Sequence, residues 1–409
     1  MARILRCGPA IASMVALCTL VALSASSLGD YPQDAGPAID ALAHGRVADF
    51  LRAHPDMGPV STLLRAPFAA FGGSQLDAYR LGALACLLAV GALGLYLASI
   101  AARRGVGRLA QALLAGACVV NPLTFAALDA GHPEELLTAA LAVAAVALAA
   151  QGHRGRAALL LGLAVATKQW AVIAVLPVLM ALPAGRMRAA LLAAGVAAAL
   201  MLPGALAAPG DFFETQRSLA IETQYVTPWS AWYPGSSAST VHLPEIHATA
   251  HPHHASAFVA RFSHPLILLA ALLLPLGLAL RRRSFAVSGA DAMALLALLA
   301  LLRCLLDPVD NLYYHAPLLF ALAGWDALAA RSLPYRVLLG AAVLELLSRW
   351  QTPTFDPGSF NGLYLGAAGI ATAALVAVLW QGKEFGSRVR TDVRPILGTN
   401  TYLDLPLQE

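Results

Sequence analysis

The chain has 409 residues, of which 59% are hydrophobic and only 12% charged, with a net charge of +4. A soluble domain of average composition is about 25% charged. These values exclude an ordinary soluble enzyme and predict an all-α, polytopic membrane protein. The small net charge gives no indication of a nucleic-acid partner.

The cysteines are spread over the apolar part of the sequence and form no CxxC pair. This pattern argues against a disulfide framework or a cysteine-based zinc site and predicts buried packing. The residues concerned are Cys7, Cys18, Cys86, Cys118 and Cys304.

The N-terminal segment places Arg3 and Arg6 before an apolar stretch over residues 8–27. This segment resembles a signal peptide. We expect it to remain as the first span because many spans follow, and its cleavage is the alternative. Further runs approach the ~20 residues that a helix needs to cross a bilayer. They cover residues 78–101, 109–127, 134–150, 188–208, 264–280, 288–306, 313–330, 334–350 and 362–381.

The run at residues 157–183 is too long for one span and has Lys168 near its middle. Arginines flank it on both sides, which places both ends in the cytoplasm under the positive-inside rule. We therefore expect two short helices forming a hairpin, with "TKQW" at the turn. Counting the hairpin as two passes predicts about 12 membrane passes with both termini cytoplasmic.

The same rule predicts one membrane domain over residues 1–382 and a cytoplasmic tail over 383–409. Long acidic loops at about 28–77 and 209–263 then lie outside, and short basic connections lie inside. This asymmetry favours an enzyme of the plasma membrane whose active site is extracytoplasmic.

The first outer loop opens with "GDYPQDAGPAIDALAHG", which places Asp30 at the end of the first span and Asp34 four residues later. A carboxylate at a span end can be held near a lipid headgroup. The segment 37–51 has apolar residues at helical spacing and predicts one amphipathic surface helix. Its charged side chains are expected on the solvated face: Asp40, Arg46 and Asp49.

The second acidic element is "LDAGHPEELL", with His132 followed by Glu134 and Glu135. Acidic residues beside Pro133 suit the start of a helix, so capping alone explains one carboxylate. It explains the histidine and two carboxylates together less well. A site role for at least one of them stays open as the alternative.

Two cations lie inside apolar runs, where an unpaired charge is costly. Lys168, followed by Gln169 and Trp170, is expected to meet a lipid phosphate. Arg303 can bond to phosphate or to Asp307. Tyr314 belongs to ordinary interfacial aromatics, whereas His315 is a candidate for a phosphate contact or a proton relay.

The order and spacing of these segments resemble the GT-C superfamily of polyprenyl-phosphate-sugar-dependent glycosyltransferases. "DYPQDAGPAIDALAHG", "GHPEELL", "GLAVATKQWAVIAVLPVL" and "DPVDNLYYHAPLL" are similar to segments of glycosyltransferase family 87. The resemblance covers roughly residues 10–330 and implies an actinobacterial, mannosyltransferase-like enzyme. It implies a polyprenyl-phosphate-sugar donor, an envelope glycolipid or glycan acceptor, membrane lipids as surroundings, and inversion at the sugar.

The resemblance also implies residue roles. In GT-C enzymes an Asp of the first outer loop is the general base, which here indicates Asp30 first and Asp34 second. The late family His maps onto His315, at the donor phosphate. Charge placement, not the resemblance, adds Lys168 and Arg303 as further phosphate ligands. We expect no cofactor and no metal, and the pocket is expected to include His132, Glu134, Glu135, Gln169, Asp307 and Tyr314.

Two other readings fit the same composition. A transporter or flippase of lipid-linked sugars would tolerate loss of Asp30 and transfer no sugar. A non-catalytic membrane protein of the same fold would leave the cell envelope unchanged when Asp30 and Asp34 are replaced.

Overall fold

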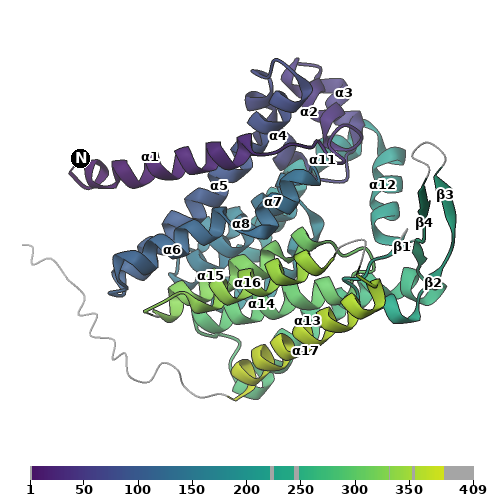
Figure 1. Cartoon of the computed structure of the whole chain (residues 1–409). Helices are drawn as coiled ribbons and strands as arrows, with labels where there is room; N and C mark the ends of the chain where they lie inside the picture. The colour runs from purple at the N-terminus through teal and green to yellow at the C-terminus, as the bar shows by residue number, and fades with distance from the viewer. Residues whose placement is uncertain (1, 222–224, 244–247, 331, 352–354, 382–409) are drawn as a thin grey trace, which may run out of the picture.

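The computed structural model describes residues 2–221, 225–243, 248–330, 332–351 and 355–381. Helices dominate these residues and run side by side in a bundle (Figure 1). In chain order they are α1 (Ala2–Leu23), α2 (Ala35–Ala43), α3 (Val47–Ala53), α4 (Pro59–Ala69), α5 (Gln75–Arg103), α6 (Arg108–Val119), α7 (Pro122–Asp129), α8 (Pro133–Ala150), α9 (Arg154–Val165), η1 (Gln169–Ala174), α10 (Val175–Ala181), α11 (Arg186–Ala207), α12 (Pro209–Ile221), η2 (Tyr233–Gly235), α13 (Ala257–Arg282), α14 (Gly289–Leu306), η4 (Leu312–His315), α15 (Ala316–Ala329), α16 (Tyr335–Trp350) and α17 (Pro357–Trp380).

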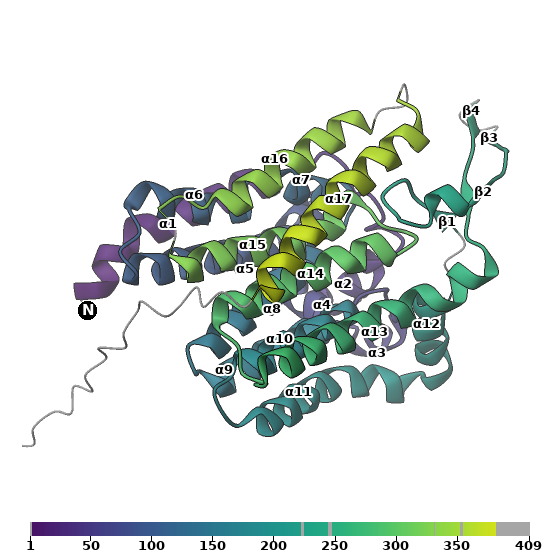
Figure 2. The same cartoon turned by 90° about the horizontal axis from the view of Figure 1, so that it is seen from below.

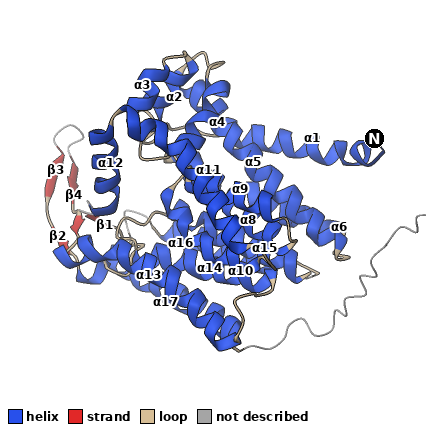
Figure 3. Cartoon of the chain, turned by 180° about the vertical axis from the view of Figure 1, so that it is seen from behind, coloured by secondary structure: helices blue, strands red, loops and turns tan. Residues whose placement is uncertain are grey.

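Two small sheets supplement the helices between α12 and α13 (Figure 3). One is three-stranded in the order β1-β5-β2 and the other pairs β3 with β4, all antiparallel. The all-α prediction missed them because each strand is only two or three residues long. The strands are β1 (Tyr225–Val226), β2 (Ser237–Ala238), β3 (Val241–Leu243), β4 (Ala248–Ala250) and β5 (His253–His254).

The core of the bundle is built on α8 and α14. In α8, 78% of the apolar 18-residue stretch is buried inside the protein, whereas in α11 only 17% of the corresponding stretch is buried. Small residues on α8, α9 and α15 allow close packing of these helices. Helices α14 and α15 run side by side in the middle of the bundle (Figure 2). Apolar helices that remain exposed on their outer faces are the ones that lipid would cover.

Seven helices of the described residues are long and apolar enough to cross a membrane, and shorter apolar helices cover Gly8–Leu23 and Gln169–Ala181. A multi-pass membrane protein is thereby supported. The runs expected at residues 313–330 and 334–350 form α15 and α16, which have 14 and 16 residues. The count of 12 passes and the single domain over 1–382 stay predictions, and the tail at 383–409 lies outside the described residues.

The break expected in the long apolar run is present. Helix α9 ends at Val165, and η1 begins at Gln169 and continues into α10. Lys168 is therefore in extended backbone between two short helices.

The prediction of one amphipathic helix over residues 37–51 is wrong. The segment forms α2 and α3, separated by a turn in which Gly45 has a φ of 71°. This left-handed conformation suits glycine and ends α2. Asp40, Arg46 and Asp49 are exposed and paired with one another, so their position on the solvated face is confirmed.

Sidedness can be tested by cysteine labelling, because Cys18, Cys86, Cys118 and Cys304 are buried. We expect Ser237→Cys, at an exposed position in β2, to react with a membrane-impermeant maleimide added to intact cells. Arg283→Cys, after α13, should react only after permeabilisation. Labelling in the reverse pattern would contradict the predicted orientation.

Candidate active site

The loop after α1 and the "GHPEE" turn are in direct backbone contact. The Asp30 amide donates to the Ala130 carbonyl at 3.0 Å. Gly29 and Gly131 have φ values of 51° and 90°, and a Cβ on Gly131 would lie 2.5 Å from the Leu28 carbonyl oxygen. Glycine is therefore required for this approach. Two segments a hundred residues apart thus hold their polar side chains together.

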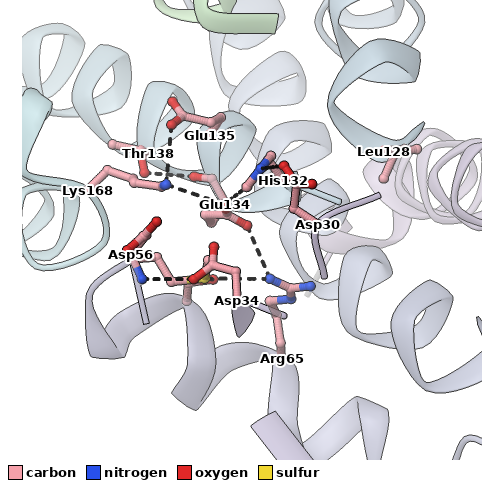
Figure 4. A network of polar contacts seen from close by, with 12 residues as sticks. Asp30, Asp34, Asp56, Arg65, Leu128, His132, Glu134, Glu135, Thr138 and Lys168 are labelled. Atoms are coloured by element: carbon pink, nitrogen blue, oxygen red, sulfur yellow. Dashed lines mark hydrogen bonds and ion pairs between the residues drawn. The ribbon is translucent and has the colours of Figure 1, made fainter. Parts of the chain in front are cut away.

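A chain of polar contacts leads inward from Asp30 (Figure 4). Asp30 Oδ2 lies 3.2 Å from His132 Nε2, and His132 Nδ1 lies 2.9 Å from Glu134 Oε1. Carboxylates only accept, so His132 must donate from both ring nitrogens and carry a positive charge. Burial alone would lower the pKa of His132, but the hydrogen bond and charge of Glu134 outweigh it and raise the pKa above 6.5.

Glu134 is the centre of this chain. Its side chain is fully buried, and Arg65 Nη1 donates to its Oε2 at 3.1 Å. Lys168 Nζ lies 3.6 Å from Glu134 Oε1 and 3.6 Å from Glu135 Oε1. A buried carboxylate persists only when such partners compensate its charge. The anions that face Lys168 in the structure are these carboxylates, and the expected lipid phosphate contact stays a prediction.

Asp34 joins the same group from the loop before α2. Its Oδ1 accepts a hydrogen bond from the Asp56 amide at 2.8 Å, and its buried Oδ2 has no partner among the described residues. Burial raises the pKa of Asp34 above 3.8, against the opposing charge of Lys168. Asp30 differs, because its side chain is 72% exposed.

Aromatic side chains of η4 and η1 complete the site. Trp170 Nε1 donates to Glu135 Oε2 at 2.7 Å, and Tyr313 stacks on His132 with ring centroids 5.4 Å apart. The buried Arg303 guanidinium lies 4.8 Å from the Trp170 ring centroid and 4.6 Å from that of Tyr314. Arg303 therefore lies next to the network through the aromatic rings.

Two expected pocket residues have other contacts. Gln169 is hydrogen-bonded to Gln216 of α12. Asp307 Oδ1 accepts from the Val309 amide at 3.1 Å, as a turn residue does.

His315 lies apart from the network. It is buried, with Nε2 3.0 Å from the Tyr364 hydroxyl and 3.6 Å from Asp310 Oδ2. Its ring also packs on Trp229 at 5.4 Å. The structure thus brings together Asp30, Asp34, His132, Glu134, Glu135 and Lys168, and sets His315 beside a second polar cluster.

The sequence-based site omitted Arg65. This side chain is fully buried and lies over the Tyr31 ring at 5.3 Å in addition to its bond with Glu134. Arginine is common between membrane spans, so the residue type alone did not indicate a site role for Arg65. Its position within "STLLRAPFAAF", an otherwise apolar stretch, could have indicated burial.

An apolar cavity of about 200 Å³ opens between α3, α4, α11 and α12. Its lining includes Met57, Phe212 and Gln169, the residue after Lys168. The Gly58 amide donates to the Thr167 carbonyl at 2.8 Å, which fixes this wall against the hairpin. The cavity therefore lies next to the cationic end of the network.

Oxygen and nitrogen atoms of Asp34, His132 and Glu134 lie within 4.8 Å of one another and could hold a metal ion. Arg65 and Lys168 already supply positive charge to Glu134. A further cation there would have to displace or oppose these side chains. The expectation of metal independence stays a prediction.

The family model described as Glycosyltransferase family 87 matches residues 58–308, more than half of the chain. The chain belongs to glycosyltransferase family 87. The matched residues include Arg65, His132, Glu134, Glu135 and Lys168. This family 87 member is a membrane glycosyltransferase, as the sequence resemblance predicted.

Solved structures extend the likeness beyond the matched family region. The crystal structure of ArnT from Cupriavidus metallidurans bound to undecaprenyl phosphate is similar at 18% identity and a TM-score of 0.51, covering 90% of this chain and 70% of that one. The apo structure of the same protein has a TM-score of 0.47 at 18% identity, covering 90% and 69%. At this identity the likeness shows the fold, and the GT-C-like architecture of the family 87 chain is confirmed. No curated protein matches it.

The requirement for glycine at position 131 can be tested by substitution. We expect Gly131→Ala to cost about 1–3 kcal/mol, because alanine is strained at this φ and its Cβ meets backbone atoms. The measurement is the thermal unfolding midpoint in detergent. Gly116→Ala is the control, since a Cβ there would meet no atom within 4 Å apart from its chain neighbours and its own helix backbone. Equal midpoints for the two variants would show that the contact is not tight.

Removing the charge of Glu134 gives a second test. We expect Glu134→Gln to destabilise the protein by about 3–5 kcal/mol, because Arg65 would remain buried without its anion. The control is Glu345→Gln, which breaks the exposed pair with Arg349 and should change the unfolding midpoint little. A Glu134→Gln midpoint as high as that of the control would contradict the buried ion pair.

Proposed function

We propose that this glycosyltransferase transfers a hexose, with mannose as the first candidate, from a polyprenyl-phosphate-linked donor to an envelope glycolipid or glycan. The transfer takes place on the extracytoplasmic face of the plasma membrane and inverts the anomeric centre. The observation that carries the proposal is the single network that joins Asp30, exposed at the surface, to the buried Lys168 through His132 and Glu134.

In this proposal Asp30 is the general base. His132 holds Oδ2 at 3.2 Å, and the 72% exposure of the side chain leaves the other oxygen accessible to an acceptor hydroxyl. A base needs to approach the hydroxyl to within about 3 Å. The exposed end of the network offers that access, whereas Asp34 is held by Asp56 and is the second candidate.

The cations of the site stabilise the leaving phosphate. Negative charge develops on the polyprenyl phosphate as the sugar departs, and fixed cations lower the barrier for this step. Lys168 is the first ligand by its position, with Arg303 behind Trp170 and Tyr314. His315 is retained from the family resemblance and requires the phosphate to reach the second cluster.

The apolar cavity supports a lipid donor. An isoprenoid chain lying against Met57 and Phe212 would end beside Gln169, and therefore beside Lys168. Support for the phosphate also comes from the solved structure of similar fold, which is ArnT bound to undecaprenyl phosphate. A lipid chain in the cavity would orient the sugar–phosphate bond toward the outer loops.

The decisive assay incubates the purified protein with labelled polyprenyl-phosphate-mannose and extracted envelope glycolipids. We expect Asp30→Asn to lower transfer by about 10²-fold or more, because the acceptor proton then has no base. Asp40→Asn is the matched control, since Asp40 is exposed on α2 and its ion-pair partners among the described residues are the nearby His44 and Arg46. Movement of labelled lipid across proteoliposomes without transfer would instead identify a flippase.

Paired variants and the pH profile test a base role for Asp34. Burial raises the pKa of Asp34 above 3.8, so a base role for Asp34 predicts activity that rises with pH through a value above 3.8. Asp34→Asn would then abolish transfer and Asp30→Asn would not. If both variants transfer sugar at the wild-type rate, neither aspartate is the base.

A further inference from the structure

A second polar cluster is buried behind η4, away from the network of Asp30 and Lys168. Cys304 at the end of α14, Asp310 in the following turn and His315 on η4 are 0%, 0% and 1% exposed. One donor atom from each lies within 4.8 Å of the others. Helix α17 covers the cluster with the Tyr364 hydroxyl.

Asp310 is the unexplained member of this cluster. Both carboxylate oxygens are buried and make no hydrogen bond of regular geometry among the described residues, although the Cys304 thiol and the Tyr364 hydroxyl approach them. A carboxylate removed from water needs a compensating cation or proton donor. His315 Nε2 lies 3.6 Å from Asp310 Oδ2 but donates no hydrogen bond to it, because this nitrogen carries no proton in the neutral ring.

The tautomer of His315 is fixed by its other nitrogen. Nδ1 lies 3.1 Å from the Leu312 carbonyl oxygen, which can only accept, so Nδ1 carries the proton. In the neutral ring Nε2 then presents a lone pair, and the Tyr364 hydroxyl donates to it at 3.0 Å. A histidine that donates one N–H to a backbone carbonyl and presents the other nitrogen has the arrangement of a metal ligand.

We propose that Cys304, Asp310 and His315 bind one Zn²⁺ ion. Thiolate, imidazole and carboxylate are the ligands that zinc takes, and three of them leave the fourth position to water. Ligands about 2.0–2.3 Å from a tetrahedral zinc are roughly 3.3–3.8 Å apart. The His315–Asp310 separation of 3.6 Å already falls in this range.

The charge of the set suits a buried dication. Binding releases the thiol proton of Cys304, which in the structure is directed to the Tyr314 carbonyl at 3.3 Å. One thiolate and one carboxylate then balance the two charges of Zn²⁺, and His315 stays neutral. This site would join α14 to η4, whose Tyr313 stacks on His132 on the opposite side. The metal therefore acts on the active site through the placement of η4, and it occupies Nε2 of His315 in place of the donor-phosphate role that the family resemblance implied.

Elemental analysis of the full-length protein tests the site. The protein is purified in detergent on an affinity tag without histidines, and the metal per chain is measured by mass spectrometry. We expect about one equivalent of zinc in the wild type and its loss in Cys304→Ser and in Asp310→Asn. Cys118→Ser is the matched control, because Cys118 is equally buried and donates to a backbone carbonyl at 3.4 Å.

Cobalt substitution gives a readout that does not depend on activity. Co²⁺ replacing zinc should produce a sulfur-to-cobalt charge-transfer band that is absent in Cys304→Ser and present in Cys118→Ser. Wild-type protein that carries no metal and binds neither added Zn²⁺ nor Co²⁺ would overturn the proposal, as would zinc content equal in all variants. Failure of the sugar-transfer assay would leave these results unaffected.

Discussion

The ion pairs of the buried Glu134 carboxylate are the interactions on which the candidate active site depends. This carboxylate is fully buried in an apolar bundle, where an uncompensated charge costs several kcal/mol. Its partners come from separate parts of the chain: Arg65 from α4, His132 from the turn before α8, and Lys168 from the break after α9. Because each partner must reach the same side chain, one carboxylate fixes α4, the turn before α8 and the segment after α9 relative to one another. The position of Asp30 follows from that of His132.

Much of this site could be predicted from the sequence, because charges within apolar runs are visible there. Lys168 interrupts a long apolar run, and the structure breaks the helix at that point. The "GHPEE" carboxylates exceed what helix capping requires, and they meet Lys168 in the structure. The family followed from the order of such segments, and the matched family model confirms it.

The remaining features depend on geometry that the sequence does not show. Residues of a 3₁₀-helix follow one another at about 120° around the axis. Tyr313, Tyr314 and His315 of η4 therefore face three different surroundings, which are His132, Arg303 and Tyr364. The cluster of Cys304, Asp310 and His315 could not be predicted from the sequence, because the spacing of these residues matches no recognisable motif. The single helix expected over residues 37–51 failed at Gly45, where backbone conformation outweighed apolar periodicity.

The buried position of Lys168 has a consequence for how the protein enters the membrane. A lysine within an apolar hairpin is inserted at a substantial energetic cost when it is alone. Its compensating carboxylates are on α8, which precedes the hairpin in the chain and is made first. The anions that neutralise Lys168 are therefore already part of the chain when the lysine is synthesised.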